Sequence, residues 1–336
     1  MIEIDGSYGE GGGQILRMGI ALASLTKKPV RIFNIRAKRP NPGLRRQHMV
    51  AIESLAKICN ARVKGLSIGS KAIEFYPSEI KGGSFEFDIG TAGSITLVLQ
   101  ACLLPSLFAE NETRLKIVGG TDVKWAPPWD YFQNVFLRLL HKMGINVEAY
   151  LNKRGYYPVG GGEVEIYINP CDKIKAIEFD EKIYGIEGLV NIANLPISIA
   201  ERVKKAAETE FKKEGLKANI MIEETSANSS GIGIVLWTKE KILGADSLGE
   251  KGRPAEQVGK EAAKKLIEEI KADVDLDEKA VDQLLPYMAI ANKKIRFKCR
   301  YLNKHAETEM WLIKKFISAS FEIKKDKIYE IEVIPK

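Results

Sequence analysis

The sequence predicts an α+β fold in which a β-α-β-α-β-β unit occurs three times, with a smaller α/β domain inserted into the third unit. A stretch of about 80 residues recurs with the same order of apolar patterns. Its strands, such as FEFDI (85–89) and EVEIYI (163–168), alternate apolar and polar residues as half-buried strands do. Its helices exceed about ten residues and space their apolar positions at the helical period.

The first two units follow this order completely. The first unit contains strand 2–5, helix 14–27, strand 30–35, helix 48–60 and strands 61–68 and 72–77. The second unit contains strand 85–90, helix 95–108, strand 113–120, helix 129–144 and strands 146–151 and 163–168. Each unit is expected to lay two helices on one face of a small mixed sheet.

The third unit is interrupted after its opening strand. Its elements are strand 175–180, helix 281–291, strand 294–300, helix 308–318 and strand 329–334. The segment between has its own elements, namely strand 188–195, helix 197–215, strands 218–224 and 231–239 and helix 254–272. We therefore expect a three-unit domain of residues 1–182 and 276–336, and an inserted α/β domain of residues 183–275.

Composition excludes several classes of protein. The 336 residues are 45% hydrophobic and 28% charged, with a net charge of +7, which is typical of a globular protein and not of a disordered chain, collagen or a coiled coil. No apolar run approaches the roughly 18 residues of a membrane-spanning helix, and MIEIDG resembles a strand rather than a secretory signal. The four cysteines are far apart, without a CxxC pair, so we expect a reducing, cytoplasmic setting and no membrane partner.

A basic loop connects the first unit's second strand and second helix. The segment RAKRPNPGLRRQH (36–48) contains five Lys or Arg residues and no acid. A solvated loop is the simplest interpretation of such a charge run. However, Pro40, Pro42 and Gly43 restrict its shape, and arginines on a stiff segment are suited to binding phosphate.

A glycine-rich loop, Gly9 to Gln14 (GEGGGQ), lies between the first strand and the first helix. Glycines allow a ligand to approach the backbone closely, and a helix N-terminus favours an anion. The loop lacks the GxxxxGK[ST] pattern and the dinucleotide-binding spacing, so a tight turn and a phosphate cradle both stay open. Glu10 is unusual in an anion site, and its carboxylate could hold a divalent cation beside a polyphosphate.

Three histidines are present, and there is no HExxH motif. His141 lies within a helical pattern, which favours a structural role, and His48 could cap a helix. His305 lies between a strand and a helix, where an exposed imidazole could act as a nucleophile toward activated phosphorus. The residues alone leave a structural histidine open at this position.

Polar residues also interrupt apolar helices near their starts. Gln14 and Arg17 are one turn apart, Gln100 interrupts LVLQACLL, and Asp282 and Gln283 precede LLPYMA. Such residues are usually satisfied structural groups. Because each unit supplies one, they also suggest convergence on one cleft.

Six segments together resemble the RNA 3′-terminal phosphate cyclase family over almost the whole chain. They are DGSYGEGGGQILR (5–17), IRAKRPNPGLRRQH (35–48), GTAGSITLVLQ (90–100), GGTDVKWAPP (119–128), GYYPVGGGEV (155–164) and VDQLLPYMA (281–289). The family fold is three repeats similar to the C-terminal domain of a bacterial translation initiation factor, plus an inserted small α/β domain.

The resemblance implies a ligase that uses ATP and a divalent metal, Mg²⁺ or Mn²⁺, at the 3′ end of RNA. A histidine attacks the α-phosphorus of ATP, and the resulting histidyl-AMP transfers AMP to the RNA 3′-phosphate. The neighbouring 2′-hydroxyl then closes a 2′,3′-cyclic phosphate and releases AMP.

The resemblance also implies residue roles. His305 matches the nucleophile and Glu10 the metal-binding carboxylate. The positions matching nucleotide-binding residues are Gln100, Pro127, Lys279, Ala280, Val281, Asp282 and Gln283, with Pro127 against adenine. The positions matching residues that contact phosphates or the RNA end are Arg17, Arg36, Arg39 and Gln47.

Two positions depart from the family pattern. Relatives usually continue the nucleophile as His-x-x-Thr-Asn, whereas Glu309 stands here in the asparagine position. Lys279 stands where bacterial relatives carry a tyrosine that stacks on adenine.

Other functions remain to be weighed. A non-catalytic relative acts in ribosome assembly and lacks the histidine, so His305 favours the cyclase. A protein that binds RNA 3′ ends without consuming ATP is a further alternative. Enolpyruvyl transferases use a related repeat fold, but they need six repeats and a longer chain.

Overall fold

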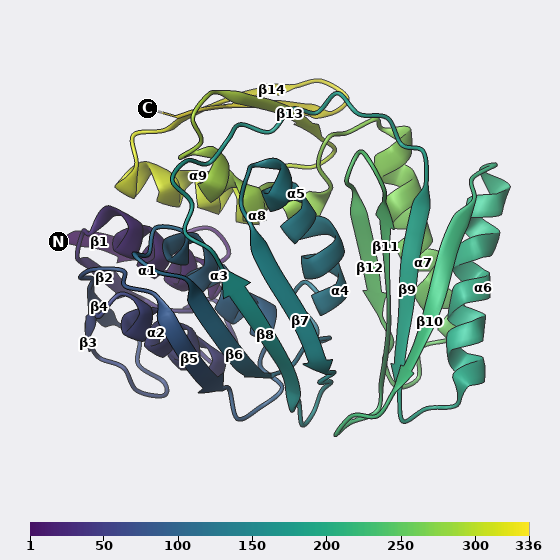
Figure 1. Ribbon diagram of the computed structural model, residues 1–336, viewed down its shortest axis with the longest axis horizontal. Coiled ribbons are helices and arrows are strands. Elements are labelled where there is room, and N and C mark those ends of the chain that lie inside the picture. Colours follow the sequence, from purple (N-terminus) through teal and green to yellow (C-terminus); the bar gives the residue numbers. More distant parts are fainter. Residues whose placement is uncertain (336) are drawn as a thin grey trace.

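The computed structural model describes residues 1–335, which form four small sheets with helices packed against them. This arrangement confirms the predicted α+β class. In Figure 1 three of the sheets and a group of helices form one body, and the fourth sheet lies beside them with two long helices on its outer side. No helix within these 335 residues is both long and apolar enough to traverse a bilayer.

The first two sheets share one topology. The first has the order β1-β2-β4-β3 and the second the order β5-β6-β8-β7, each with one parallel pair followed by two antiparallel pairs. The strands of the first sheet are β1 (Ile2–Asp5), β2 (Val30–Phe33), β3 (Arg62–Lys64) and β4 (Ile73–Tyr76). Those of the second are β5 (Gly83–Asp88), β6 (Thr113–Gly119), β7 (Val147–Lys153) and β8 (Gly162–Ile168).

The helices of these two units match the predicted ranges closely. They are α1 (Gln14–Thr26), α2 (Arg46–Ile58), α3 (Ile95–Ser106), and a helix that runs through α4 (Trp129–Tyr131), η1 (Phe132–Phe136) and α5 (Leu137–Lys142). The middle of the last helix, η1, has π-helical hydrogen bonding, which sequence periodicity does not reveal. Helix α3 is almost entirely buried, which explains its continuous apolar sequence.

The third unit differs from the prediction in two strands, one at its start and one near the C-terminus. Its sheet consists of β13 (Ile295–Cys299), β14 (Ser320–Lys325) and β15 (Tyr329–Ile334) in the order β13-β15-β14, and helices α8 (Glu278–Met288) and α9 (Lys304–Phe316) belong to it. The predicted opening strand 175–180 is wrong: Ile177, and Ile174 just before the segment, are buried against the core, but the segment pairs with no strand in the described chain. Strand β14, rich in lysine and exposed, was not predicted.

The fourth sheet contains the elements predicted for residues 183–275, and one more. Its order is β10-β9-β11-β12, and its strands are β9 (Ile186–Ala193), β10 (Ala218–Thr225), β11 (Gly231–Thr238) and β12 (Gly244–Leu248). Helices α6 (Ile197–Lys213) and α7 (Ala255–Lys271) cover its outer face. Strand β12 falls where the sequence predicted only a glycine-rich connection.

Two hydrophobic clusters lie within residues 1–335. The buried residues of the smaller cluster all fall between Ile186 and Val274, and the larger cluster gathers most of the other buried apolar residues. Val235, Trp237 and Ile242 extend from the fourth sheet into the larger cluster. The fourth sheet is therefore covered by its own helices on one face and by the body containing α4 on the other.

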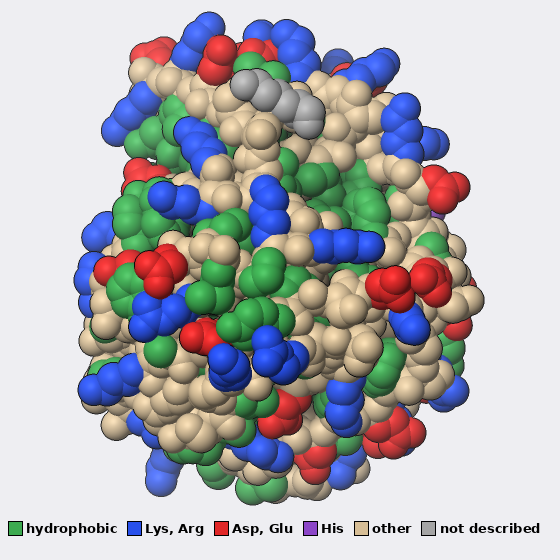
Figure 2. All heavy atoms as spheres, turned by 90° about the vertical axis from the view of Figure 1, so that its left-hand side faces the viewer, with side chains coloured by type: hydrophobic (Ala, Val, Ile, Leu, Met, Phe, Trp, Pro, Cys, Tyr) green, Lys and Arg blue, Asp and Glu red, His purple; other side chains and the backbone are tan. Residues whose placement is uncertain are grey.

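The mild positive charge is not concentrated on the face shown in Figure 2. Lys and Arg side chains there are interspersed with Asp and Glu and with small hydrophobic areas. An extended single-sign surface, of the kind that binds nucleic acid by charge alone, is not seen on that face.

Candidate active site

His305 lies in the first turn of α9, which packs between α1 and α8. The turn is fixed because the Asn303 side chain accepts a hydrogen bond from the backbone N–H of Ala306 at 2.8 Å. The imidazole is about 40% exposed. The histidine is therefore held by a rigid helix start and is still accessible to a ligand.

Gln14, the first residue of α1, orients the imidazole. Its amide nitrogen donates to the backbone carbonyl of His305 at 3.0 Å and to Glu309 Oε2 at 2.8 Å. Its amide oxygen lies 2.7 Å from His305 Nδ1. Because this oxygen only accepts, Nδ1 carries the hydrogen, and the lone pair of the neutral ring is on Nε2.

Glu10 faces the other ring nitrogen. Its Oε2 lies 3.0 Å from His305 Nε2 and 3.5 Å from the guanidinium of Arg39. Burial lowers the pKa of His305, the Glu10 carboxylate opposes that shift, and Arg17 and Arg39 reinforce it. The small pocket in front of the imidazole is lined by Tyr8, Glu10, Gly11, Gly12, Gln14, Ile15, His305 and Thr308.

The glycine-rich loop has these glycines because side chains crowd it from outside. A Cβ at Gly13 would lie 2.5 Å from His48 Nε2 and 2.8 Å from the guanidinium of Arg17. A Cβ at Gly12 would lie 2.9 Å from the guanidinium of Arg39. The loop thus lets several cations and an imidazole approach one stretch of backbone, as an anion cradle requires.

Arg17 lies behind the loop, is only 8% exposed, and donates to Gln100 Oε1 at 3.3 Å. Its Nε has no partner within residues 1–335. Burial lowers its pKa to about 10, and the nearby carboxyls of Glu309 and Asp282 oppose that shift. The guanidinium thus remains charged at neutral pH with much of its hydrogen-bonding capacity unused.

Two acids share this interior. Burial, and then the neighbouring Asp282, raise the pKa of Glu309 well above its ordinary value. Burial raises the pKa of Asp282 to about 7, although part of its surface is exposed. Glu309 Oε1 has no partner in the described chain, so this part of the site is incompletely hydrogen-bonded.

The start of α8 forms a second group. Asp277 caps the helix by accepting from the backbone N–H groups of Lys279 at 3.0 Å and Ala280 at 3.1 Å. Lys279 forms an ion pair with Asp246 of β12 and lies 5.6 Å from the Tyr131 ring centre. Gln283 donates to the Lys279 carbonyl at 2.8 Å.

Other predicted site residues are buried or make structural hydrogen bonds. The Ala280 and Val281 side chains are buried in the core, so only their backbone can meet a ligand. Pro127 is buried, and its carbonyl accepts from Thr96 Oγ1 at 2.8 Å. Gln47 accepts from the backbone N–H of Ser94, the N-cap of α3, at 3.2 Å.

The basic loop divides into two parts. Arg39 faces Glu10, whereas Arg36 folds back and donates to the carbonyls of Asn41 at 2.6 Å and Gly43 at 2.9 Å. The structure thus brings Glu10, Arg17, Arg39, Gln100 and His305 together. It does not bring the Arg36 guanidinium into contact with them.

Sequence reasoning missed two contributors. Gln14 was noted only as a polar residue one turn from Arg17, and its contact with His305 depends on a helix almost three hundred positions away. Asp246 lies in the unpredicted strand β12, and no motif marks it.

The carboxylates fit only one mode of metal binding. No group of three or more His, Cys, Asp or Glu side chains placed to hold a metal ion occurs within the 335 described residues. Mg²⁺ commonly uses one or two carboxylates together with substrate phosphates, and Glu10 beside the glycine loop can supply that arrangement.

These features define a class of site, namely an oriented and partly exposed histidine beside a glycine-rich loop, with arginines close by. The comparisons specify it further. The sequence matches the family described as RNA 3′-terminal phosphate cyclase over residues 8–323, so the chain belongs to that family.

Curated relatives agree with this assignment. The chain is 48% identical to the RNA 3′-terminal phosphate cyclase of Pyrococcus furiosus, covering 96% of this chain and 95% of the relative. It is 49% identical to that of Ignicoccus hospitalis, with coverage of 94% and 93%. An EPSP synthase structure from Acinetobacter baumannii aligns with 97% of this chain and 47% of its own at 12% identity, but its TM-score of 0.28 is too low to support an argument.

Proposed function

We propose that this protein converts an RNA 3′-phosphate into a 2′,3′-cyclic phosphodiester at the expense of ATP. The observation that carries the proposal is the geometry of His305. The Gln14 amide oxygen lies 2.7 Å from Nδ1 and accepts its hydrogen, which leaves Nε2 as the nucleophilic atom, in a chain that belongs to the cyclase family.

The first step is nucleotidyl transfer to His305. Nε2 forms a bond to the α-phosphorus of ATP while the bond from that phosphorus to the bridging oxygen breaks, and pyrophosphate leaves. Burial, which lowers the pKa of His305, keeps the imidazole neutral and nucleophilic. The Nδ1–H donated to Gln14 stabilises the positive charge that the ring acquires on attack.

The nucleotide would lie between the two groups of residues. Gln100 is placed beside Arg17. Pro127, which is buried here and tied to the start of α3, matches the position that packs on adenine in the family. The start of α8, Lys279 to Gln283, would face the nucleotide with side chains of Lys279, Asp282 and Gln283 and with the backbone of Ala280 and Val281. Lys279 replaces a stacking tyrosine, so its pairing with Asp246 gives this chain a more polar base site.

Glu10 would hold a divalent cation, Mg²⁺ or Mn²⁺, which neutralises charge on the triphosphate when bound. Its carboxylate oxygen lies 3.0 Å from His305 Nε2. This contact is a hydrogen bond only while Nε2 carries a proton, so a cation that took over the carboxylate would favour loss of that proton and expose the Nε2 lone pair.

The RNA end would be bound by the cationic side of the pocket. Arg17 and Arg39 suit a terminal phosphate, and Gln47 and Arg36 stabilise the neighbouring helix start and basic loop. AMP passes to the 3′-phosphate to give RNA(3′)pp(5′)A, and the 2′-oxygen then attacks that phosphate and displaces AMP. Because the ribose already holds the hydroxyl in place, its effective molarity is on the order of 10⁵ M or more. A single-stranded end exposes the sugar edge that this step needs.

The fold supports a matching division of the chain. We propose three repeats in residues 1–182 and 276–336, with residues 183–275 as the inserted domain. The shared order of the first two sheets and the separate smaller hydrophobic cluster support this division. In the third repeat, the unpaired segment 175–180 occupies the place of the first strand in sequence order.

The test is covalent labelling. The protein is incubated with α-³²P-ATP and Mg²⁺, separated by denaturing electrophoresis, and treated with acid or alkali. We expect an acid-labile, alkali-stable band, typical of a phosphoramidate, and at least a thousandfold less label in His305→Ala. His141→Ala removes an exposed histidine on α5 and serves as the matched control.

The opposite result selects an alternative function. No label on a folded wild-type protein that still binds 3′-phosphate RNA would contradict the cyclase proposal. The protein would then be an RNA-end binder or a non-catalytic relative, and His305 would be structural.

A further inference from the structure

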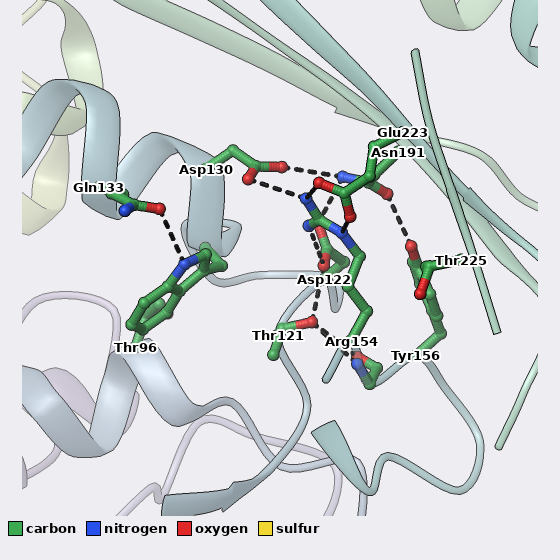
Figure 3. Close-up of polar contacts among 12 residues, drawn as sticks. Thr96, Thr121, Asp122, Asp130, Gln133, Arg154, Tyr156, Asn191, Glu223 and Thr225 are labelled. Carbon is green, nitrogen blue, oxygen red and sulfur yellow. Dashed lines mark hydrogen bonds and ion pairs between the residues drawn. The ribbon is translucent and has the colours of Figure 1, made fainter. Parts of the chain in front are cut away.

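Arg154, directly after β7, is almost completely buried and contacts three carboxylates. It is 2% exposed, and it donates to Asp122 at 3.2 Å, to Asp130 at 3.0 Å and to Glu223 at 2.6 and 3.1 Å. Figure 3 shows the guanidinium between these acids, where segments from two parts of the chain meet. Glu223 lies on β10 of the fourth sheet, whereas the two aspartates belong to the body containing the second sheet.

The buried members of this cluster, which we call the Arg154 cluster, are linked to one another. Asn191 on β9 donates to Asp122 at 3.1 Å and to Asp130 at 3.0 Å, and it accepts from the Tyr156 hydroxyl at 2.8 Å. Thr121 donates to Asp122 at 2.7 Å. Every carboxylate oxygen of both aspartates therefore has a donor, as a stable buried ionic network requires.

The cluster holds both ends of one loop. Asp122 and Asp130 flank the segment that carries Pro127, and the backbone N–H of Trp129 closes it by donating to the Thr121 carbonyl at 3.0 Å. Within the loop, Pro127 is tied to α3 through Thr96. The two aspartates thus fix where the proline lies relative to the start of α3, and two residues of the fourth sheet, Asn191 and Glu223, fix the aspartates.

Apolar side chains at this contact would hold the fourth sheet against the rest of the protein with a smaller desolvation penalty. Desolvating the three buried charged groups, Arg154, Asp122 and Asp130, is expensive, and an apolar cluster of similar volume is often at least as stable. The ionic cluster makes the contact directional, because a guanidinium donates hydrogen bonds only along its fixed N–H vectors. The arrangement is therefore suited to setting the loop's position rather than to maximising stability.

We propose that the Arg154 cluster positions the Pro127 loop for ATP and couples the inserted segment 183–275 to nucleotide binding. This inference rests on the proposed function, since it takes Pro127 as the surface for adenine. Glu223 and Asn191 are then positioning residues for the nucleotide, although they belong to a different sheet from the histidine.

The test compares two neighbouring glutamates on β10. Glu223→Gln weakens the hold of the fourth sheet on Arg154, whereas Glu224→Gln alters an exposed neighbour on the same strand with the same change of charge. The initial rate of protein labelling is measured against ATP concentration. We expect Glu223→Gln to raise the half-saturating ATP concentration about tenfold with less than a twofold change in maximal rate, and Glu224→Gln to match the wild type.

A double-mutant cycle separates positioning from plain stability. If the cluster acts through the loop, Glu223→Gln adds little to the ATP defect of Pro127→Gly, because coupled residues are non-additive. Additive defects, or an unchanged ATP dependence in Glu223→Gln with only a lower melting temperature, would overturn the inference. Both results are read on a wild type that labels normally, so they are distinguishable from failure of the proposed function, in which the wild type itself takes no label.

Discussion

Two arginines are buried within residues 1–335, and their surroundings differ. Arg154 is 2% exposed and makes four hydrogen bonds to three carboxylates. Arg17 is 8% exposed and makes one long hydrogen bond to Gln100, and its Nε lacks a partner among residues 1–335. One guanidinium is saturated by the protein, and the other keeps most of its donors free.

The effects of the neighbouring carboxylates on the two guanidinium groups also differ, although burial raises the pKa of Asp130 as well. Asp122, Asp130 and Glu223 outweigh the burial that lowers the pKa of Arg154 and hold that pKa above its ordinary value. Around Arg17, burial dominates and favours the neutral forms of Glu309 and Asp282. A saturated cluster indicates a structural contact, whereas unsatisfied buried groups beside the proposed nucleophile indicate a place for a ligand.

Removing the saturated arginine should have the largest effect on stability. Arg154→Met leaves two buried aspartates without their counter-ion, and we expect a loss of about 3–5 kcal/mol in the free energy of unfolding. Urea denaturation followed by circular dichroism measures it. Arg202→Met, which breaks the exposed pair with Glu256, is the control and should cost at most about 1 kcal/mol. Equal losses in the two variants would show that the buried Arg154 cluster stabilises the fold no more than an exposed ion pair does.

Removing Arg17 should instead have a large effect on activity and a small effect on stability. In Arg17→Met we expect the rate of RNA cyclisation to fall by roughly 10²–10³ and the free energy of unfolding to change by less than about 1 kcal/mol. The stability change is small because the raised pKa of Glu309 favours its neutral form, and Asp282, with a pKa of about 7, is only partly ionised at neutral pH. Arg62→Met, on the exposed strand β3, should retain full activity. A destabilised but active Arg17→Met protein would show that Arg17 is structural.

The smallest effect concerns Glu309 and depends on pH. Its pKa is raised in the folded chain, so between the unfolded value near 4.3 and the raised value the folded state binds more protons than the unfolded state. Stability conferred by the protonated carboxyl is therefore full at low pH and is lost as pH rises. Glu309→Gln cannot ionise, so its melting temperature relative to wild type should increase from pH 5 to pH 8 by about 2–4 °C.

Glu224→Gln supplies the baseline for this pH series, because it removes an exposed carboxylate. A difference between Glu309→Gln and wild type that stays constant with pH would mean that Glu309 is ionised in the folded protein. Glu309 would then be an ionised carboxylate near Arg17, as the carboxylates of the Arg154 cluster are near Arg154.

Much of the fold could be predicted from the sequence because its periodic segments are long. Helices α1, α2 and α3 and the strands of the first two sheets lie within a few residues of their predicted ranges. The errors occur where periodicity is weak. Segment 175–180 reads as a strand, yet its buried residues pack without pairing, and the lysine-rich β14 forms only because it pairs with β15.

The site was predictable where a motif marks it and not where tertiary contacts make it. The family pattern pointed to His305, Glu10 and Arg39, which the fold brings together. It also pointed to Arg36, whose guanidinium instead binds its own loop. The contacts of Gln14 with His305 and of Asp246 with Lys279 join elements distant in sequence, and no local pattern contains them.

The central claim is that His305, oriented by Gln14, is the nucleophile. The most direct measurement is peptide mass spectrometry, under non-acidic conditions, of protein incubated with ATP and Mg²⁺. We expect AMP on the peptide that contains His305, and unmodified peptides for His48 and His141. AMP on His48, on His141 or on a lysine, with the His305 peptide unmodified, would contradict it.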